Sequence, residues 1–293
     1  MEIFQKNRTL FVKAPAKLNL FLEVLGERGD GYHELETVMQ TVTLYDELTL
    51  ELASSGVRLV TDSPDVPHTR ENLAVRAAEL LLEHARRRLG ATIRLEKRIP
   101  VGAGMGGGSS DAAAALMGLN RLWQLDLQRE TLHELASRLG SDVPFFLYGG
   151  TALCRGRGDQ IAQISGVTPF TYVVVWPRLK VSTKEVYEKL PPDLTKDLRQ
   201  TKLLLRELIK GPQAGVFPHF FNRLESVTVQ LHDSLTLLAR RMTESGLAGV
   251  TMTGSGSAFF GASGSRKEAD ESMETLNRIG VGDVFVVEST HTS

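Results

Sequence analysis

A glycine-rich stretch followed by alanines, between Ile99 and Leu116, is the part of this sequence that points most directly to chemistry. So many glycines disfavour a packed strand or helix, because glycine loses the most backbone freedom on ordering and has no side chain to bury. Ser109, Ser110 and Asp111 are residue types that cap a helix start, and the alanines after them favour a helix. A loop that leads into a helix N-terminus presents unpaired N–H groups and the positive end of the helix dipole. The stretch therefore predicts an anion site, most simply a phosphate site.

Two better-known glycine loops do not fit. A Walker-type loop counted from Gly102 needs Lys at the position of Gly108. The spacing of Gly102, Gly104 and Gly107 matches a dinucleotide-binding loop, but the strand before it, 92–97, alternates apolar and charged residues as a half-solvated antiparallel strand does. A flexible linker is disfavoured, because linkers are not followed directly by a capped, alanine-rich helix.

Two further stretches place polar side chains where they could act together. Between residues 11 and 24 leucines alternate with polar residues, so Lys17 and Asn19 are expected on one face of a strand. After a turn, Tyr32 and His33 precede a second alternating run, Leu35 to Leu44. From the residues alone, Tyr32 and His33 fit an ordinary strand start as well as a functional pair.

The segment Gly140-Ser141-Asp142-Val143-Pro144 is the third candidate. Ser141 or Asp142 as N-cap and Pro144 in the first helical turn would explain these residues structurally. A catalytic carboxylate at Asp142 is the other interpretation, and the local pattern leaves both open.

The composition limits the class of protein. The 293 residues are 42% hydrophobic and 24% charged with a net charge of −1, which suggests two domains or one large one. Near-neutral charge argues against nucleic acid as the main partner. No apolar run has the length of a membrane span and the start lacks a signal peptide, so a cytoplasmic protein is expected. The single cysteine, Cys154, excludes an internal disulfide and a cysteine-based zinc site.

The elements that must position these residues alternate between strands and helices. Helices are expected at 73–89, with Asn72 as N-cap and Gly90 as stop signal, and at 126–139, 198–210 and 221–244. A turn-rich connection is expected at 149–158. Near the C-terminus, the order strand, tight turn, strand, helix, strand indicates an α+β fold with antiparallel pairing.

Three separated motifs resemble those of the galactokinase, homoserine kinase, mevalonate kinase and phosphomevalonate kinase superfamily. They are the strand 15–20, the loop 100–111 and the turn 253–257. Within the superfamily, the chain most closely resembles the kinases of the non-mevalonate isoprenoid pathway that act on a cytidine-diphosphate-linked methylerythritol. The residues that carry this narrower match lie at 16–20, 29–33, 106–112 and 140–146.

The resemblance implies a two-domain α+β kinase fold. Domain 1–165 would be similar to a ribosomal-protein domain and carry the glycine loop, and domain 166–293 would be ferredoxin-like. The implied reaction transfers the γ-phosphoryl group of ATP to the 2-hydroxyl of the cytidylated alcohol, which lies between the domains. Lys17 and Asp142 would be catalytic.

The remaining site residues follow from the same resemblance. The ATP-binding residues would be Pro100, Val101, Gly102, Ala103, Gly104, Met105, Gly106, Gly107, Gly108, Ser109 and Ser110. The substrate-binding residues would be Asn19, Tyr32, His33, Thr183, Tyr187, Gly254 and Ser255, with Tyr187 a candidate to stack on cytosine. Mg²⁺ is expected with ATP, with Ser110 as a candidate ligand and no carboxylate pair dedicated to the metal. The expected partner is the small-molecule substrate, with no nucleic acid and no membrane, for a monomer or weak homodimer.

Two other functions stay open at this point. The first is a kinase of the same superfamily for another small alcohol, such as mevalonate, homoserine or a sugar; Tyr32 and His33 argue against it. The second is a non-catalytic nucleotide- or RNA-binding module on the same fold. The neutral charge and the presence of both Lys17 and Asp142 argue against that.

Overall fold

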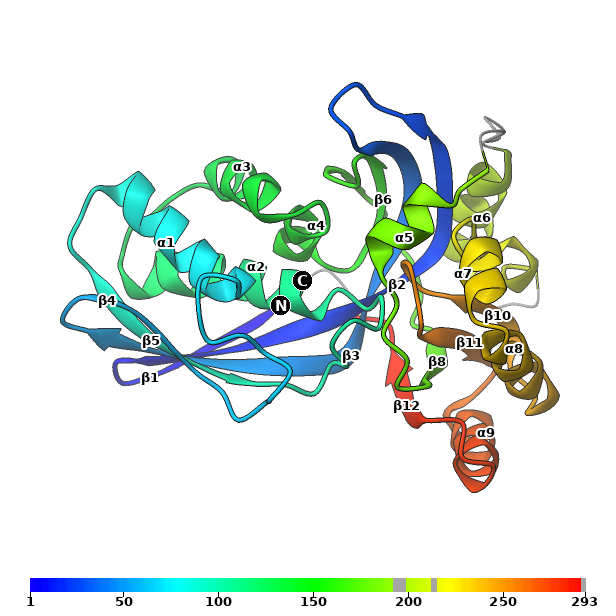
Figure 1. Cartoon of the computed structure of the whole chain (residues 1–293). Helices are drawn as coiled ribbons and strands as arrows, with labels where there is room; N and C mark the ends of the chain where they lie inside the picture. Colours follow the sequence, from blue (N-terminus) through cyan, green and yellow to red (C-terminus); the bar gives the residue numbers. More distant parts are fainter. Residues whose placement is uncertain (192–198, 212–214, 291–293) are drawn as a thin grey trace. The chain divides into compact units, whose positions relative to one another are not determined.

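The computed structural model describes residues 1–191, 199–211 and 215–290. Helices and mostly antiparallel sheets make up the chain (Figure 1), and the expected α+β class is confirmed. The chain divides into two compact units that alternate along the sequence. The first unit comprises residues 1–16, 44–101 and 106–149, and the second comprises 17–43, 102–105 and the described residues from 150 onward. The domain boundary expected between 165 and 166 stays a prediction.

The elements have the following bounds. The strands are β1 (Glu2–Lys6), β2 (Thr9–Glu27), β3 (His33–Ala53), β4 (Gly56–Val60), β5 (Gly90–Glu96), β6 (Thr151–Gly156), β7 (Gln160–Gln163), β8 (Thr171–Trp176), β9 (Phe221–Asn222), β10 (Ala248–Met252), β11 (Phe259–Ser263) and β12 (Asp283–Glu288). The helices are α1 (Leu73–Ala85), α2 (Gly107–Leu122), α3 (Arg129–Leu139), α4 (Val143–Tyr148), α5 (Thr183–Glu188), α6 (Arg199–Lys210), α7 (Glu225–Leu231), α8 (Ser234–Glu244), α9 (Arg266–Arg278) and the 3₁₀ turn η1 (Phe217–His219). Among the described residues, no helix has the length and apolar character needed to cross a membrane.

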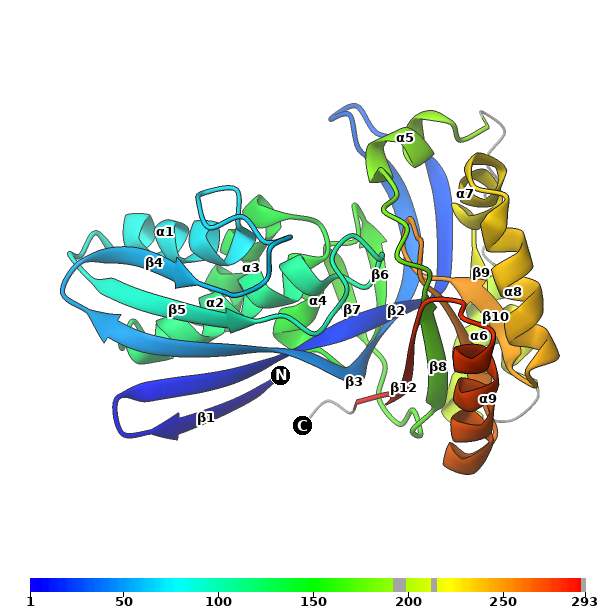
Figure 2. The ribbon, with the colours of Figure 1, turned by 60° about the horizontal axis from the view of Figure 1, so that its bottom comes forward.

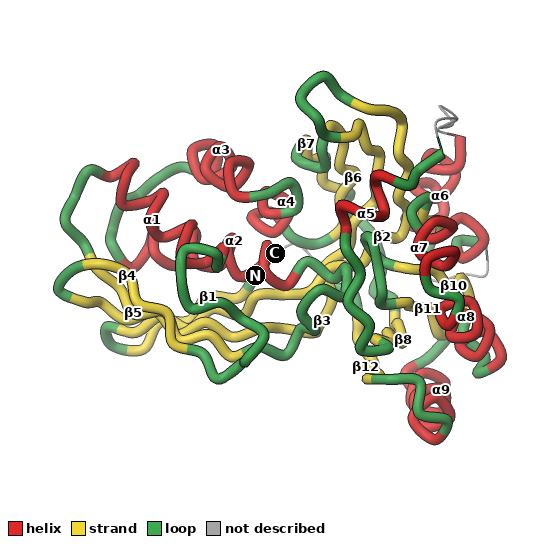
Figure 3. The backbone as a smooth tube through the Cα atoms, viewed as in Figure 1, coloured by secondary structure: helices red, strands yellow, loops and turns green. Residues whose placement is uncertain are grey.

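The first unit is a sheet with helices on one face. β1 pairs with β2, β3 pairs antiparallel with β5, and β4 runs parallel to β5. Helices α1, α2 and α3 lie over the same face of these strands (Figures 2 and 3). The packing of α2 on the sheet is close, since a Cβ atom at Gly118 would lie 2.3 Å from Cδ1 of Leu50. Burying this sheet face fixes α2, whose first turn continues from the glycine loop.

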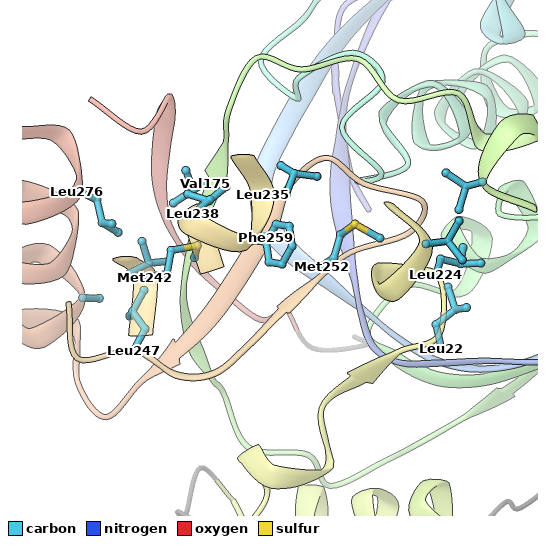
Figure 4. Packing of buried hydrophobic residues seen from close by; sticks show 14 of the residues in the cluster. Leu22, Val175, Leu224, Leu235, Leu238, Met242, Leu247, Met252, Phe259 and Leu276 are labelled. Carbon is cyan, nitrogen blue, oxygen red and sulfur yellow. The ribbon is translucent and has the colours of Figure 1, made fainter. Parts of the chain in front are cut away.

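The second unit contains a four-stranded antiparallel sheet with the order β10-β11-β8-β12. One buried cluster joins this sheet to α7, α8 and α9; it includes Phe259, Met252 and Leu238 (Figure 4). Leu22 and Val24 of β2 belong to the same cluster. The strand that carries Lys17 is therefore anchored in the hydrophobic core of the second unit.

The C-terminal boundary of α1 differs from that expected. Helix α1 begins after its Asn72 cap as expected, but it ends at Ala85 rather than Leu89. Arg86 adopts a left-handed conformation with φ 50° and its N–H bonds the Leu82 carbonyl, which closes the helix. Gly90 is instead the first residue of β5.

The helix after the glycine loop begins earlier than expected. Gly106, with φ 72°, is the N-cap of α2, and no side chain caps the helix. The expectation that Ser109, Ser110 and Asp111 cap this helix is wrong, because the helix already begins at Gly107; its N-cap, Gly106, has no side chain and leaves the first N–H groups without a side-chain acceptor. The two serines and Asp111 lie inside the first turns instead.

Three other expectations are corrected. The helix expected at 221–244 is interrupted, since β9, α7 and α8 share that range. The turn-rich connection at 149–158 contains β6, which forms an antiparallel hairpin with β7. The helix expected from Asp126 begins at Arg129, after Asp126 with φ 53°.

Candidate active site

Lys17 and Asn19 occupy the same face of β2, as expected, and both are almost fully buried. The Lys17 Nζ donates to the Asn19 Oδ1 at 2.5 Å and to the Gly104 carbonyl at 2.7 Å. The Asn19 Oδ1 also accepts from the Gly254 N–H at 3.0 Å. The Asn19 side-chain amide donates to Thr37 on β3 at 2.9 Å. One strand thus holds the middle of the glycine loop and the turn after β10.

The loop and the turn approach each other so closely that only glycine fits. A Cβ atom at Gly104 would lie 2.2 Å from the Thr253 carbonyl oxygen, and one at Gly254 would lie 2.7 Å from the Gly104 oxygen. Thr253 completes the contact, since its Oγ1 accepts from the Asn19 N–H at 3.1 Å. The two glycine motifs therefore meet by backbone-to-backbone packing within the second unit.

The turn after β10 is held from two other sides. Asn222 donates its side-chain amide to the carbonyls of Met252 at 2.7 Å and of Gly254 at 2.8 Å. Ser255 is hydrogen-bonded through its hydroxyl to the Thr183 hydroxyl at 2.7 Å, which brings the start of α5 to the turn. Thr183, Gly254 and Ser255 therefore lie close to one another.

Two aromatic side chains are in contact at the start of β3, and Tyr32 directly precedes that strand. The ring of His33 lies 4.7 Å from the ring of Tyr187 on α5. Tyr32 is 50% exposed, and its N–H donates to Asp30 at 3.1 Å. This hydrogen bond, together with Arg28, lowers the pKa of Asp30 below its usual value. The turn before β3, the start of β3 and α5 thus each present an aromatic ring that can stack on a planar ligand.

In the first unit, the end of the glycine loop begins helix α2. The Ser110 hydroxyl is fully buried, and among the described residues it has no hydrogen-bond partner. A buried hydroxyl without a partner is costly, so it marks a place where a ligand atom can be received. Phosphate oxygens or a cation beside them would satisfy it.

A buried charge cluster lies at the base of this helix. Lys97, the residue directly after β5, donates to Asp111 at 2.8 Å and also contacts Asp46 of β3. The other oxygen of Asp46 accepts the backbone N–H groups of Arg98 at 2.6 Å and Ile99 at 2.9 Å. Asp46 therefore fixes the chain just before the loop, while Asp111 fixes the helix just after it.

Only one ammonium faces two carboxyl groups in this cluster. Burial raises the pKa of Asp111 to about 8; Lys97 opposes the rise and Asp46 adds to it. Burial alone would lower the pKa of Lys97, but Asp111 and Asp46 outweigh this and raise it. Among the described residues, the Asp111 Oδ1 has no partner, whereas Asp46 accepts three donors. We therefore assign the proton of the cluster to Asp111, since a neutral acid is cheaper to bury unpaired than a carboxylate.

Asp142 stands at the N-cap position of α4 but makes no capping hydrogen bond with its side chain. The residue is partly buried. Asp142 therefore occupies the N-cap position that the structural interpretation predicted, but its carboxylate does not cap the helix.

The structure also contains site residues that the sequence did not single out. Thr37, Thr253 and Asn222 complete the buried network around Asn19. Thr253 begins the turn 253–257 that the sequence analysis identified as a motif, so its place in the site could have been inferred from that motif. No sequence pattern indicated Thr37 or Asn222. No group of three or more His, Cys, Asp or Glu side chains suited to a metal is found within residues 1–191, 199–211 and 215–290.

Similarity to known proteins is extensive. A family model described as the GHMP kinases N terminal domain matches residues 72–150. The chain is 45% identical over 249 residues to the 4-diphosphocytidyl-2-C-methyl-D-erythritol kinase of Pelotomaculum thermopropionicum, covering 85% of this chain and 87% of that one. It is 38% identical over 268 residues to the enzyme of the same name from Macrococcus caseolyticus, covering 91% and 95%.

Solved structures agree in fold. A crystal structure of a 4-(cytidine 5'-diphospho)-2C-methyl-D-erythritol kinase matches with a TM-score of 0.83 and 41% identity, over 95% of this chain and 98% of that one. A homoserine kinase from Cytophaga hutchinsonii matches with a TM-score of 0.78 at 21% identity, over 98% and 96%. The second likeness concerns the fold alone.

The close approach of loop and turn gives a test by substitution. Gly104→Ala is expected to lower the free energy of unfolding by roughly 1–3 kcal/mol more than Gly102→Ala, because only the first adds a Cβ atom against a backbone oxygen. Gly102 is a matched control, since its φ of 74° is close to the 80° of Gly104 and its nearest neighbour would be 3.9 Å away. Urea unfolding of both variants measures the difference. Equal losses would contradict the packing described.

The proton on Asp111 gives a pH test. A carboxyl group whose pKa is raised in the folded state adds stability at low pH, and this stability is lost as pH rises from about 4 towards about 8. Asp111→Asn copies the protonated acid, so its melting temperature should match the wild type near pH 4 and exceed it by a growing margin up to pH 8. Melting curves across this range test the prediction, and parallel curves would refute it.

Asp46→Asn is the control for that experiment. The Lys97 ammonium and the backbone N–H groups of Arg98 and Ile99 all lose a charged acceptor in this variant. It should therefore destabilise the protein by about 3–5 kcal/mol at both pH values.

Proposed function

The chain belongs to the family of 4-diphosphocytidyl-2-C-methyl-D-erythritol kinases, and from this premise we propose how its residues carry out the reaction. It transfers the γ-phosphoryl group of ATP to the 2-hydroxyl of 4-(cytidine 5'-diphospho)-2-C-methyl-D-erythritol. The observation that carries the residue assignment is the buried Lys17 ammonium, which bonds both Asn19 and the Gly104 carbonyl. Through it, a strand, the glycine loop and the turn at 253–255 share one hydrogen-bond network.

ATP is the phosphoryl donor, and we assign its phosphates to residues 100–110. The start of α2 offers the unpaired N–H groups of a helix N-terminus, which favour an anion. The buried Ser110 hydroxyl, which has no partner among the described residues, fits a phosphate or metal ligand. Because α2 has no side-chain cap, no carboxylate competes with the phosphates at its first N–H groups.

Mg²⁺ is part of the proposal, and the residues present are compatible with it. Mg²⁺ keeps several waters and binds mainly through substrate phosphates with one or two protein ligands. The Ser110 hydroxyl is the protein ligand that we assign. The ion supplies charge neutralisation at the phosphate oxygens.

Asp142 is assigned to the proton of the acceptor hydroxyl. A sugar-type hydroxyl has a pKa close to the ~15.7 of water, so it is far too weak an acid for a carboxylate to deprotonate it in advance. Asp142 accepts the proton as the new P–O bond forms, which suits a phosphoryl transfer governed by positioning and charge. Lys17 offsets negative charge on the transferred phosphoryl group.

The cytidine part is assigned to the second unit. Tyr32, His33 and Tyr187 provide the rings, with the hydroxyls of Thr183 and Ser255 nearby on α5 and the turn. Asn19 is almost fully buried, and its side chain bonds the groups that frame the site. We therefore assign Asn19 a positioning role in addition to the substrate contact implied by the resemblance.

A substrate panel tests the function. Purified protein with ATP and Mg²⁺ should release ADP in the presence of the cytidylated alcohol and not with mevalonate, homoserine or galactose. Turnover with one of the other alcohols and none with the cytidylated one would refute the proposed acceptor. ATP binding without turnover of any alcohol would favour a nucleotide-binding module.

The role of Asp142 gives the main kinetic prediction. Asp142→Asn is expected to lower kcat by about 10²- to 10⁴-fold, since the proton acceptor is lost while shape is kept. The affinity for ATP should change little. Steady-state kinetics and equilibrium nucleotide binding measure both effects.

Asp126→Asn, an exposed carboxylate of the same unit, is the control and should behave as the wild type. Near wild-type turnover of Asp142→Asn would exclude Asp142 as the base.

A further inference from the structure

Arg157 lies against the most exposed aromatic side chain of the candidate site. Its guanidinium carbon is 4.7 Å from the centre of the Tyr32 ring. Such a distance is typical of a cation–π contact, in which a planar guanidinium covers one face of the ring. Tyr32 is nevertheless 50% exposed, so the contact leaves much of the ring accessible.

The β6–β7 hairpin brings Arg157 to this place. Gly156, the last residue of β6, pairs with Leu35 of β3, and Arg157 follows directly in the hairpin turn. Because β3 runs antiparallel to β6, the turn residues of the hairpin lie beside the residues before Leu35, where Tyr32 is found. The pairing register thus accounts for the contact.

Asp159 fixes the orientation of the guanidinium. The Arg157 Nη2 donates to the Asp159 Oδ2 at 3.0 Å and the Nε donates to the same oxygen at 3.3 Å. Both side chains are only about a fifth to a quarter exposed, at 24% for Arg157 and 20% for Asp159. A guanidinium held in this way does not lose much further rotational freedom when the ring beside it becomes ordered.

We propose that Arg157 is a positioning residue for the cytidylated alcohol, covering one face of Tyr32 so that the opposite face is ready to stack on the cytosine ring. The inference rests on the proposed function, in which Tyr32 contacts the cytidine part. Without Arg157, an exposed tyrosine at a turn samples several rotamers, and binding must fix it. Arg157 removes that cost before the substrate arrives.

Kinetics of single and double variants test the inference. Arg157→Leu should raise KM for the cytidylated alcohol about 3- to 30-fold, the range expected for a cation–π contact, while kcat and KM for ATP stay near the wild type. Arg157→Lys keeps the charge without the planar group and should recover part of the loss. A structural role alone would instead lower the melting temperature and affect both substrates.

The double variant gives the sharper readout. If Arg157 acts through Tyr32, then Tyr32→Leu raises KM for the cytidylated alcohol and adding Arg157→Leu raises it no further. Arg129→Leu is the matched control, because Arg129 lies 5.4 Å from the ring of Tyr148, which has no proposed substrate role. It should leave every kinetic constant unchanged.

Two results would overturn the inference while leaving the proposed reaction intact. One is an unchanged KM in Arg157→Leu when Tyr32→Leu raises it; the other is an effect of Arg157→Leu that adds fully to that of Tyr32→Leu. An unchanged KM in Tyr32→Leu, with normal wild-type turnover, would overturn the substrate role of Tyr32 and this inference together. Absence of wild-type turnover with the cytidylated alcohol would refute the proposed function itself.

Discussion

The hydrogen bonds of the buried Lys17 ammonium are the interaction on which the second unit's site depends. An ammonium removed from water needs polar partners, and Lys17 finds them in the Asn19 Oδ1 and the Gly104 carbonyl. Asn19 in turn donates its side-chain amide to Thr37 and accepts the Gly254 N–H at its Oδ1. Four chain segments far apart in sequence are thereby fixed around one charge. The alternation of β2 makes this possible, because it places Lys17 and Asn19 on the same face.

The first unit fixes the glycine loop by a separate device. Asp46, Lys97 and Asp111 tie the end of β5 to the first turns of α2, so the chain before and after the loop is held by buried hydrogen bonds. Phosphoryl transfer is governed by positioning and charge, and it therefore benefits from a loop whose flanks are held by such hydrogen bonds. The proton on Asp111 leaves the cluster without net charge beside an anion-binding helix start, which avoids repulsion of the phosphates.

Much of this arrangement could be predicted from the sequence, because strong local patterns carried it. The leucine alternation predicted the strand of Lys17, and the order of elements near the C-terminus predicted the antiparallel sheet. Helix ends were less predictable: Arg86 closes α1 in a left-handed conformation, and Gly106 starts α2 without a side-chain cap. Partners such as Thr37 and Asn222 depend on tertiary contacts across many residues, so no local signal identified them. Arg157 lies in the expected turn-rich connection 149–158, and only the pairing register of β6 with β3 indicates that it lies beside Tyr32.

Phosphorus-31 NMR of the product is the most direct test of the central claim, that this chain phosphorylates the cytidylated alcohol with ATP. After incubation of the purified protein with both substrates and Mg²⁺, the account predicts one new phosphomonoester signal, with the diphosphate linkage to cytidine intact and ADP formed in equal amount. A new phosphorus signal that is split by the proton on C3 or by the protons on C1 would place the phosphate on one of those carbons. Because the quaternary C2 carries no proton, this result would contradict the assigned hydroxyl. Formation of free phosphate and ADP alone would contradict the proposed transfer.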